Sequence, residues 1–239
     1  TGWGQEGPMS NLAGHDINYI SLSGALNAIG RKDSNPLAPL NLVGDYGGGC
    51  MHLAFGIVAA LIHSLKTGEG QVVDSAMIDG SLSLMSFFYS LKEMGHWTDK
   101  RESNLLDGYA HFYDTYECKD NKFVAIGSIE SQFYNELLEK LQIDDRRFLD
   151  QYNKELWPEL KDIMTAKIKS KSRSEWIEIF SESDACVTPV LDMEEAQAHP
   201  HNISREAFTN IDGFNQPNAS PRYSKTCLLY TSDAADEFM

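Results

Sequence analysis

A glycine-rich segment in front of an apolar stretch is the strongest constraint on how this chain can fold. Residues 47–49 are all glycine, Asp45 stands just before them, and residues 51–66 are apolar almost throughout. Glycine allows positive φ angles and close backbone approach, whereas a helix that is apolar all round belongs in a core. The segment therefore predicts a tight turn with a carboxylate at its mouth, followed by a helix over residues 51–66 that is buried on most sides.

Apolar spacing and turn residues predict the elements around this segment. Residues 9–30 have the spacing of a helix, and residues 31–42, which contain two prolines, are typical of a loop. Residues 71–74 favour a short strand because two adjacent valines suit a pleated surface. Residues 78–94, rich in Leu, Met and Phe, predict another helix.

A change in composition near Tyr109 indicates a second set of elements. They are a β-hairpin with strands over 109–118 and 123–126, helices over 132–141 and 155–168, a helix opened by a capping box at Ser172 and Glu175, a strand over 187–191 and a helical turn over 194–198. From residue 201 onwards the pattern is typical of a loop.

Together these patterns predict an α/β chain with several parts. Residues 1–75 form one domain, 76–108 a helical linker, 109–190 a small α+β domain and 191–226 a return segment. Residues 227–239 resemble translated sequencing adapter and are excluded from the fold. This tail, and a first residue that is not Met, indicate an internal fragment of a longer gene.

Composition excludes some classes of function. A formal net charge of −15 over 239 residues argues against a general nucleic-acid binder, which needs a basic face. Cys50, Cys118, Cys186 and Cys227 are scattered and predict reduced thiols. They favour the bacterial cytoplasm, or the mitochondrial or peroxisomal matrix in a eukaryote. The longest uninterrupted apolar run, residues 53–62, is too short to span a bilayer.

Two side chains are candidates for proton transfer. His15 has the near-neutral pKa of a general base, and Asp45 follows 30 positions later. Each has a structural alternative, because a lone histidine is often a core residue and an Asp before glycines is often a turn residue. Asp16 could orient His15 or cap a helix, and Glu130 could face a cleft or only begin a helix.

Five stretches of the sequence carry a family resemblance. They are Gly14-His15-Asp16-Ile17-Asn18-Tyr19, Asp45-Tyr46-Gly47-Gly48-Gly49, Gly127-Ser128-Ile129-Glu130-Ser131-Gln132-Phe133-Tyr134, and Cys186-Val187-Thr188-Pro189-Val190-Leu191 followed by His199-Pro200-His201-Asn202. Together they resemble the α-methylacyl-CoA racemases of the CoA-transferase family III superfamily, in register over residues 1–223.

The resemblance implies a role for each candidate. His15 and Asp45 would act on opposite faces of C2 of a 2-methylacyl-CoA, one removing a proton to give an enolate and the other returning one. Glu130 would orient His15, and the backbone N–H of Asp16 would stabilise the enolate oxygen. Residues 14–19 would contact the thioester end of CoA. Tyr113 would line the acyl pocket.

The resemblance also implies an architecture and partners. The fold would be a Rossmann-like large domain, of which residues 1–75 are the remaining CoA-binding part, and a small α+β domain, in an interlocked homodimer. The substrate would be an acyl-CoA thioester, with CoA part of the substrate and no further cofactor, metal, nucleic acid or membrane. Branched fatty acyl, bile-acid precursor and aryl-propionyl chains remain open.

Two other functions stay open. In a family III CoA-transferase, Asp16 would be the nucleophile and would pass through an acyl-enzyme anhydride and an enzyme–CoA thioester. The chain could also be a non-catalytic binding or interaction module.

Overall fold

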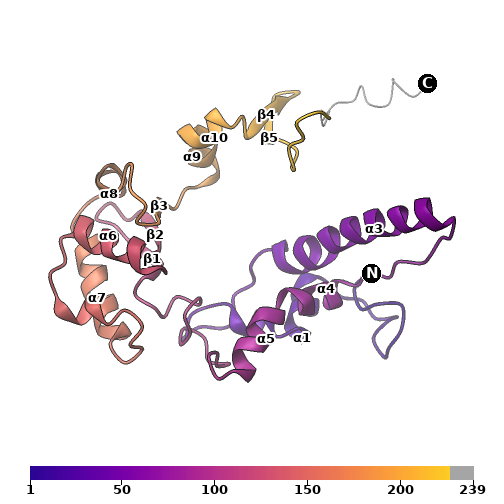
Figure 1. Cartoon of the computed structure of the whole chain (residues 1–239), viewed down its shortest axis with the longest axis horizontal. Coiled ribbons are helices and arrows are strands. Elements are labelled where there is room, and N and C mark those ends of the chain that lie inside the picture. Colours follow the sequence, from indigo (N-terminus) through magenta and orange to yellow (C-terminus); the bar gives the residue numbers. More distant parts are fainter. Residues whose placement is uncertain (227–239) are drawn as a thin grey trace. The chain divides into compact units, whose positions relative to one another are not determined.

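The computed structural model describes residues 1–226, and the prediction made for residues 227–239 lies outside them. The chain divides into two compact units, with the boundary between Thr188 and Pro189. The first unit carries an amino-terminal group of helices and a small domain built on a sheet (Figure 1). The second unit holds two short helices and a hairpin.

Helices make up the amino-terminal half of the first unit. They are α1 (Asp16–Leu22), α2 (Ala25–Ala28), η1 (Leu42–Met51), α3 (His52–Thr67), α4 (Met77–Leu84) and α5 (Ser86–Glu93). The helix expected over residues 9–30 begins only at Asp16, and it is divided because Gly24 takes a φ of 83° between α1 and α2. The helix expected over residues 78–94 is divided at Met85.

The three glycines lie inside η1, a π-helix, and not in a tight turn. They allow η1 to pack closely on α4. A Cβ atom at Gly48 would lie 2.7 Å from the backbone nitrogen of Ser81, and one at Gly80 would overlap the carbonyl group of Gly48. The turn prediction was therefore wrong, because these glycines serve helix packing. Single π-helical segments occur often at functional sites.

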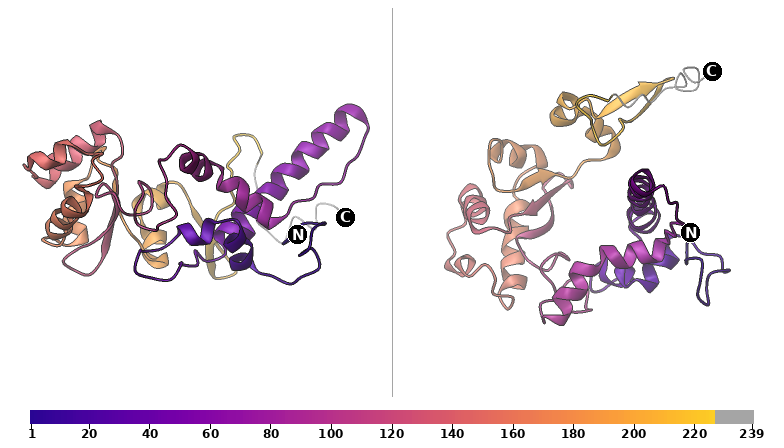
Figure 2. Two further views of the ribbon diagram at one scale, coloured as in Figure 1. Left: turned by 90° about the horizontal axis from the view of Figure 1, so that it is seen from below. Right: turned by 45° about the vertical axis from the view of Figure 1, so that its right-hand side comes forward.

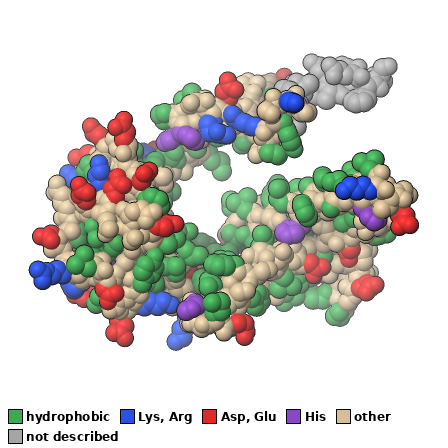
Figure 3. Space-filling view, viewed as in Figure 1, with side chains coloured by type: hydrophobic (Ala, Val, Ile, Leu, Met, Phe, Trp, Pro, Cys, Tyr) green, Lys and Arg blue, Asp and Glu red, His purple; other side chains and the backbone are tan. Residues whose placement is uncertain are grey.

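The helix α3 is apolar but exposed, which corrects the expectation of a buried helix. None of its residues is buried, and Phe55 and Leu65 are 77% and 86% exposed. Figures 1 and 2 show α3 extending beyond α4, and Figure 3 shows hydrophobic side chains along it. An apolar helix is buried only where another surface covers it, and the sequence pattern does not reveal whether such a surface is present.

The segment after α3 runs beside it without forming a strand. A Cβ atom at Gly56 of α3 would lie 3.0 Å from Val73. A strand needs a hydrogen-bonded neighbour, and residues 71–74 have no strand conformation. The strand prediction for residues 71–74 was therefore wrong.

One helical stretch is long and apolar enough to cross a membrane. η1 and α3 together, Leu42–Thr67, span 26 residues, and an 18-residue window within them has a mean hydropathy of 1.6. The expectation based on residues 53–62 was too narrow, because it considered only uninterrupted apolar residues. The core helix of a soluble protein meets the same criteria, so length and composition do not place this stretch in a bilayer.

The small domain is built on a three-stranded sheet in the order β1-β2-β3. The strands are β1 (Tyr113–Glu117), β2 (Phe123–Gly127) and β3 (Val187–Pro189). β1 and β2 are antiparallel, with Tyr113 opposite Gly127 and Glu117 opposite Phe123. The predicted hairpin is confirmed, with a first strand shorter than expected.

Helices around this sheet complete one core (Figure 1). They are α6 (Ser131–Leu141), the 3₁₀-helix η2 (Arg146–Leu149), α7 (Trp157–Ile168) and α8 (Arg173–Ile179). The largest side chains that are almost fully buried in this core are Phe112, Leu137, Leu141, Phe148, Trp157, Leu160, Met164, Ile168 and Trp176. The predicted capping box is present, since Ser172 Oγ accepts from the Glu175 N–H at 3.4 Å and Glu175 Oε2 accepts from the Ser172 N–H at 2.8 Å.

The second unit corrects the expectation of a loop from residue 201. It contains α9 (Met193–Ala198), α10 (Pro200–Ser204), β4 (Phe208–Ile211) and β5 (Phe214–Pro217) (Figure 2). β4 and β5 are antiparallel. Asp212 and Gly213 form their two-residue connection with φ angles of 52° and 88°. An Asp-Gly pair of this kind is a strong hairpin signal, which the loop prediction overlooked.

Candidate active site

The first turn of α1 fixes the backbone that carries His15. His15 precedes the helix with an extended conformation, φ −131° and ψ 173°. Its backbone N–H donates to Asn18 Oδ1 at 3.0 Å, and the hydroxyl of Tyr19 donates to the carbonyl oxygen of Gly14 at 2.6 Å. Trp3 packs edge to face on Tyr19, with ring centroids 4.7 Å apart. These contacts therefore fix the backbone around His15, while His15 itself is exposed to solvent.

Asp16 connects α1 to the segment that carries Asp45. Its Oδ2 atom accepts from the backbone N–H groups of Gly44 at 2.7 Å and Asp45 at 2.8 Å. The Asp45 carboxylate, on a half-buried residue, accepts from Asn41 Nδ2 at 3.2 Å. Sequence reasoning missed the contribution of Asn41, for which the only signal is an amide four residues before Asp45.

Glu130 lies on a different element from His15 and Asp45. It precedes α6 with φ −73° and ψ 144°, and it is exposed. Burial raises the pKa of the Cys186 thiol, and the nearby carboxylate of Glu130 raises it further. Within residues 1–226, no hydrogen bond joins Glu130 to His15. The orienting role of Glu130 remains a prediction.

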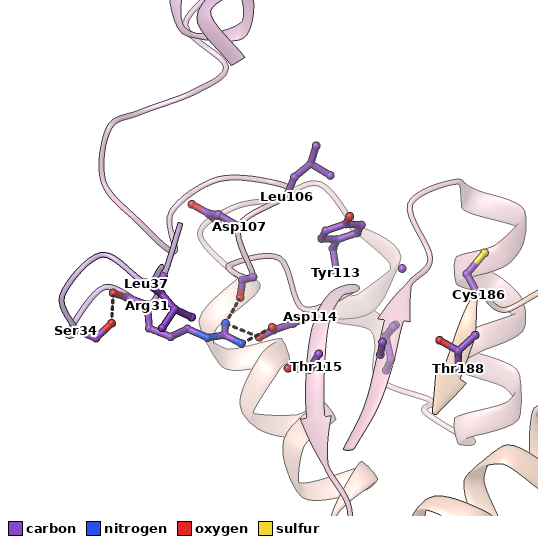
Figure 4. Close-up of a pocket in the computed structure, with 15 residues that line it drawn as sticks. Arg31, Ser34, Leu37, Leu106, Asp107, Tyr113, Asp114, Thr115, Cys186 and Thr188 are labelled. Atoms are coloured by element: carbon purple, nitrogen blue, oxygen red, sulfur yellow. Dashed lines mark hydrogen bonds and ion pairs between the residues drawn. The ribbon is translucent and has the colours of Figure 1, made fainter. Parts of the chain in front are cut away.

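A cavity of about 770 Å³ lies beside the sheet of the small domain (Figure 4). Tyr113, Thr188 and Cys186 stand on its sheet side, and Arg31 reaches it from the loop after α2. Its other lining residues are Gly30, Ser34, Leu37, Leu106, Asp107, Gly108, Asp114, Thr115, Ala125, Ile126 and Gly127. The predicted pocket residue Tyr113 thus lines a cavity, whereas the three predicted catalytic side chains do not line it.

Four charged side chains form a network at one wall of this cavity, which we call the Arg31 network. Arg31 donates to both carboxylate oxygens of Asp114, at 2.9 and 2.6 Å, and this contact raises the pKa of Arg31. Lys161 Nζ lies 2.6 Å from Asp114, and Glu102 pairs with Arg31 at 3.3 Å and with Lys161 at 3.2 Å. Two cations and two anions neutralise one another, so the network favours structural cohesion over capture of a charged ligand.

Metal chemistry has no ready ligand set in the part of the chain described. Across residues 1–226, no three His, Cys, Asp or Glu side chains gather in an arrangement that could hold a metal ion.

Two curated proteins are similar to this chain over most of its length. The chain is 44% identical to the α-methylacyl-CoA racemase of Mus musculus over 227 residues, covering 95% of the chain and 60% of that protein. It is 43% identical to the Homo sapiens α-methylacyl-CoA racemase over 238 residues, covering 100% of the chain and 61% of the relative. The chain therefore spans about 60% of the length of these curated relatives.

A solved structure and a family model place the fold. The crystal structure of a CAIB/BAIF family protein from Brucella suis is similar with a TM-score of 0.76 at 20% identity, covering 94% of this chain and 60% of the other. This likeness confirms the predicted α/β fold. Because the model of CoA-transferase family III matches residues 1–234, the chain belongs to CoA-transferase family III.

Proposed function

We propose that the protein carrying this chain is a racemase that inverts C2 of 2-methylacyl-CoA thioesters. The observation that carries the proposal is the pair of hydrogen bonds from the Gly44 and Asp45 N–H groups to Asp16. They join the segment that bears His15 to the segment that bears Asp45. The racemase names of the similar mouse and human proteins support the same reaction class.

The proposed chemistry needs two bases and one preorganised donor. One of His15 and Asp45 removes the α-proton of the thioester, and the other delivers a proton to the opposite face of the enolate. The N–H of Asp16, as the first residue of α1, has no acceptor within the helix. It is free to donate to the oxygen on which negative charge develops. No step in this sequence requires a redox change.

The proposal also assigns roles to Glu130, residues 14–19 and Tyr113. Glu130 orients His15, residues 14–19 contact the thioester end of CoA, and Tyr113 lines the pocket for the acyl group. The active form is an interlocked homodimer. A reducing compartment suits the free thiols of Cys50, Cys118 and Cys186.

The test is deuterium incorporation at C2 of (R)- and (S)-2-methylacyl-CoA in D₂O, with the full-length protein. Exchange from both epimers is expected, and His15→Ala and Asp45→Ala should abolish inversion. His96→Asn is the matched control, because His96 is exposed on a different segment. Absence of exchange by the unmodified protein would refute the racemase proposal.

A second candidate function is CoA transfer through Asp16. It is favoured by the other carboxylate oxygen of this residue, Oδ1, which is buried and has no hydrogen-bond partner within residues 1–226. An unpaired carboxylate oxygen keeps the lone pairs that attack on a thioester carbonyl requires. Hydroxylamine or borohydride added during turnover would label Asp16 in a transferase. Turnover without such labelling would exclude this alternative.

A further inference from the structure

Asp16 lies between the two segments that carry the proposed bases. We propose that its side chain is a positioning residue, which fixes the Asp45 carboxylate relative to His15 for proton transfer. This inference rests on the racemase function proposed above. It assigns to the Asp16 side chain a role distinct from that of its backbone N–H and from that of a nucleophile.

Asp16 supplies the hydrogen-bond acceptor for two backbone groups at the start of η1. In a π-helix the N–H groups of the first turn have no intrahelical acceptor, and the first such bond here runs from the Tyr46 N–H to the Asn41 carbonyl at 3.3 Å. Gly44 and Asp45 come just before Tyr46. Both N–H groups instead donate to Asp16 Oδ2, at 2.7 and 2.8 Å.

The contact between Asp16 and η1 is buried. Asp16 is only 6% exposed, so water competes little for its two hydrogen bonds. Hydrogen bonds to an ionised carboxylate are about twice as strong as neutral ones. The main chain of Asp45 is therefore held by Asp16, and its carboxylate is held by Asn41 at 3.2 Å.

The absence of a side chain at residue 44 leaves room for the Asp16 carboxylate. A Cβ atom on Gly44 would lie 2.6 Å from Asp16 Oδ2 and 3.2 Å from Ile20. Glycine thus permits the carboxylate to reach the two N–H groups. An added methyl group would displace the end of the Asp16 side chain, which gives a way to disturb the contact without replacing Asp16.

The consequence for catalysis follows from the position of Asp16 in the sequence. Asp16 follows His15 in the chain, and its side chain accepts a hydrogen bond from the backbone of Asp45. One residue therefore connects the backbones of the two proposed bases. A displacement of about 1 Å at a reacting group can lower a rate about 100-fold. Loss of the Asp16 contact should displace Asp45 while leaving the Asn18 contact of His15 in place.

The experiment compares isotope exchange from the two epimers in D₂O for full-length Asp16→Ala, Asp16→Asn and Gly44→Ala proteins. Asp45→Asn provides the reference, since it identifies the epimer whose proton Asp45 removes. Exchange from that epimer should fall about 100-fold in Asp16→Ala and should also fall in Gly44→Ala. Exchange from the other epimer should be largely retained, because exposed His15 can recover deuterium from solvent.

Rescue separates positioning from folding and from nucleophilic attack. Asp16→Asn keeps an acceptor oxygen and should recover much of the exchange, whereas a nucleophilic role would leave it inactive. Asp33→Asn, in an exposed loop, is the control and should match the unmodified protein.

Three results would overturn the inference. The first is an equal loss of isotope exchange from both epimers, in proportion to the fraction of unfolded protein. The second is full activity of Asp16→Ala. The third is equal inactivity of Asp16→Ala and Asp16→Asn. Should Asp16→Ala not fold, the epimer bias of Gly44→Ala decides the question. No exchange by the unmodified protein would instead refute the racemase function itself, which is a separate outcome.

Discussion

Lowering the pH from 7 to 4.5 is expected to destabilise the small domain through His111. The side chain is fully buried and packs edge to face on Phe112, Tyr134 and Phe148. Its Nε2 atom lies 2.6 Å from the Tyr134 hydroxyl, and Nδ1 has no hydrogen-bond partner among the residues described. Burial lowers the pKa of His111 from 6.5 to about 4, because an imidazolium ion would lose its hydration there.

The sign and size of the effect follow from proton linkage. Between pH 6.5 and 4 the unfolded chain binds a proton at His111 that the folded chain does not bind. The stabilisation is therefore complete above pH 6.5 and is lost as the pH falls through this range. One pKa unit corresponds to about 1.4 kcal/mol, so the whole loss is about 3 kcal/mol, and about 2 kcal/mol of it should be reached by pH 4.5.

Urea unfolding at pH 7 and pH 4.5, followed by tryptophan fluorescence, measures this loss. Trp157 and Trp176 are buried in the same core and report on its unfolding. His111→Phe removes the titrating group and should reduce the difference between the two pH values by about 2 kcal/mol. Exposed His96→Asn should keep the full difference. An equal loss in His111→Phe and the unmodified chain would refute the reasoning.

Three further substitutions test packing, charge and capping by urea unfolding. Gly80→Ala should lower the free energy of unfolding by about 1–3 kcal/mol, because its Cβ would overlap the Gly48 carbonyl. Gly70→Ala is the control and should have little effect, since the space around Gly70 is open. Asp114→Asn should cost about 2 kcal/mol, since this carboxylate joins the two cations of the Arg31 network; an unchanged midpoint would show that the network adds nothing. Ser172→Ala should cost about 1 kcal/mol through loss of the α8 capping box, and equal stability would count against the cap.

Local signals in the sequence predicted local structure. The capping box of Ser172 and Glu175 depends on residues three apart, and the structure confirms it. The hairpin of β1 and β2 depends on a four-residue polar turn between an aromatic, partly alternating stretch and an apolar one, and it is confirmed as well. In both cases the interacting groups are close in the chain, so the pattern contains the information that decides the structure.

The failures concern interactions with distant or absent surfaces. The apolar pattern of α3 predicted burial, but burial depends on what packs against the helix, and all of α3 is at least partly exposed. Residues 71–74 had strand propensity, but they pair with no strand within residues 1–226. The hairpin of β4 and β5 is different, because its Asp-Gly connection is a local signal that is typical of a two-residue hairpin turn.

The candidate site also combines local signals with contacts between residues that are distant in the sequence. His15 and Asp45 were proposed from residue type, but the contact between their segments joins residues 28 and 29 positions apart through one carboxylate oxygen. No periodicity links Asp16 to Gly44. Only folding of the intervening chain reveals that a residue next to one candidate base holds the other.

The exposed apolar face of α3 has a consequence for the colloidal behaviour of the chain. Leu53, Phe55, Ile57, Leu61 and Leu65 are each more than two-fifths exposed, and such a surface draws molecules together. The formal net charge of −15 keeps molecules apart at low ionic strength. At 0.1 M salt this repulsion is screened beyond about 10 Å, and sulfate strengthens apolar association. Ammonium sulfate should therefore precipitate this chain at a protein concentration at which the chain stays dispersed in dilute buffer.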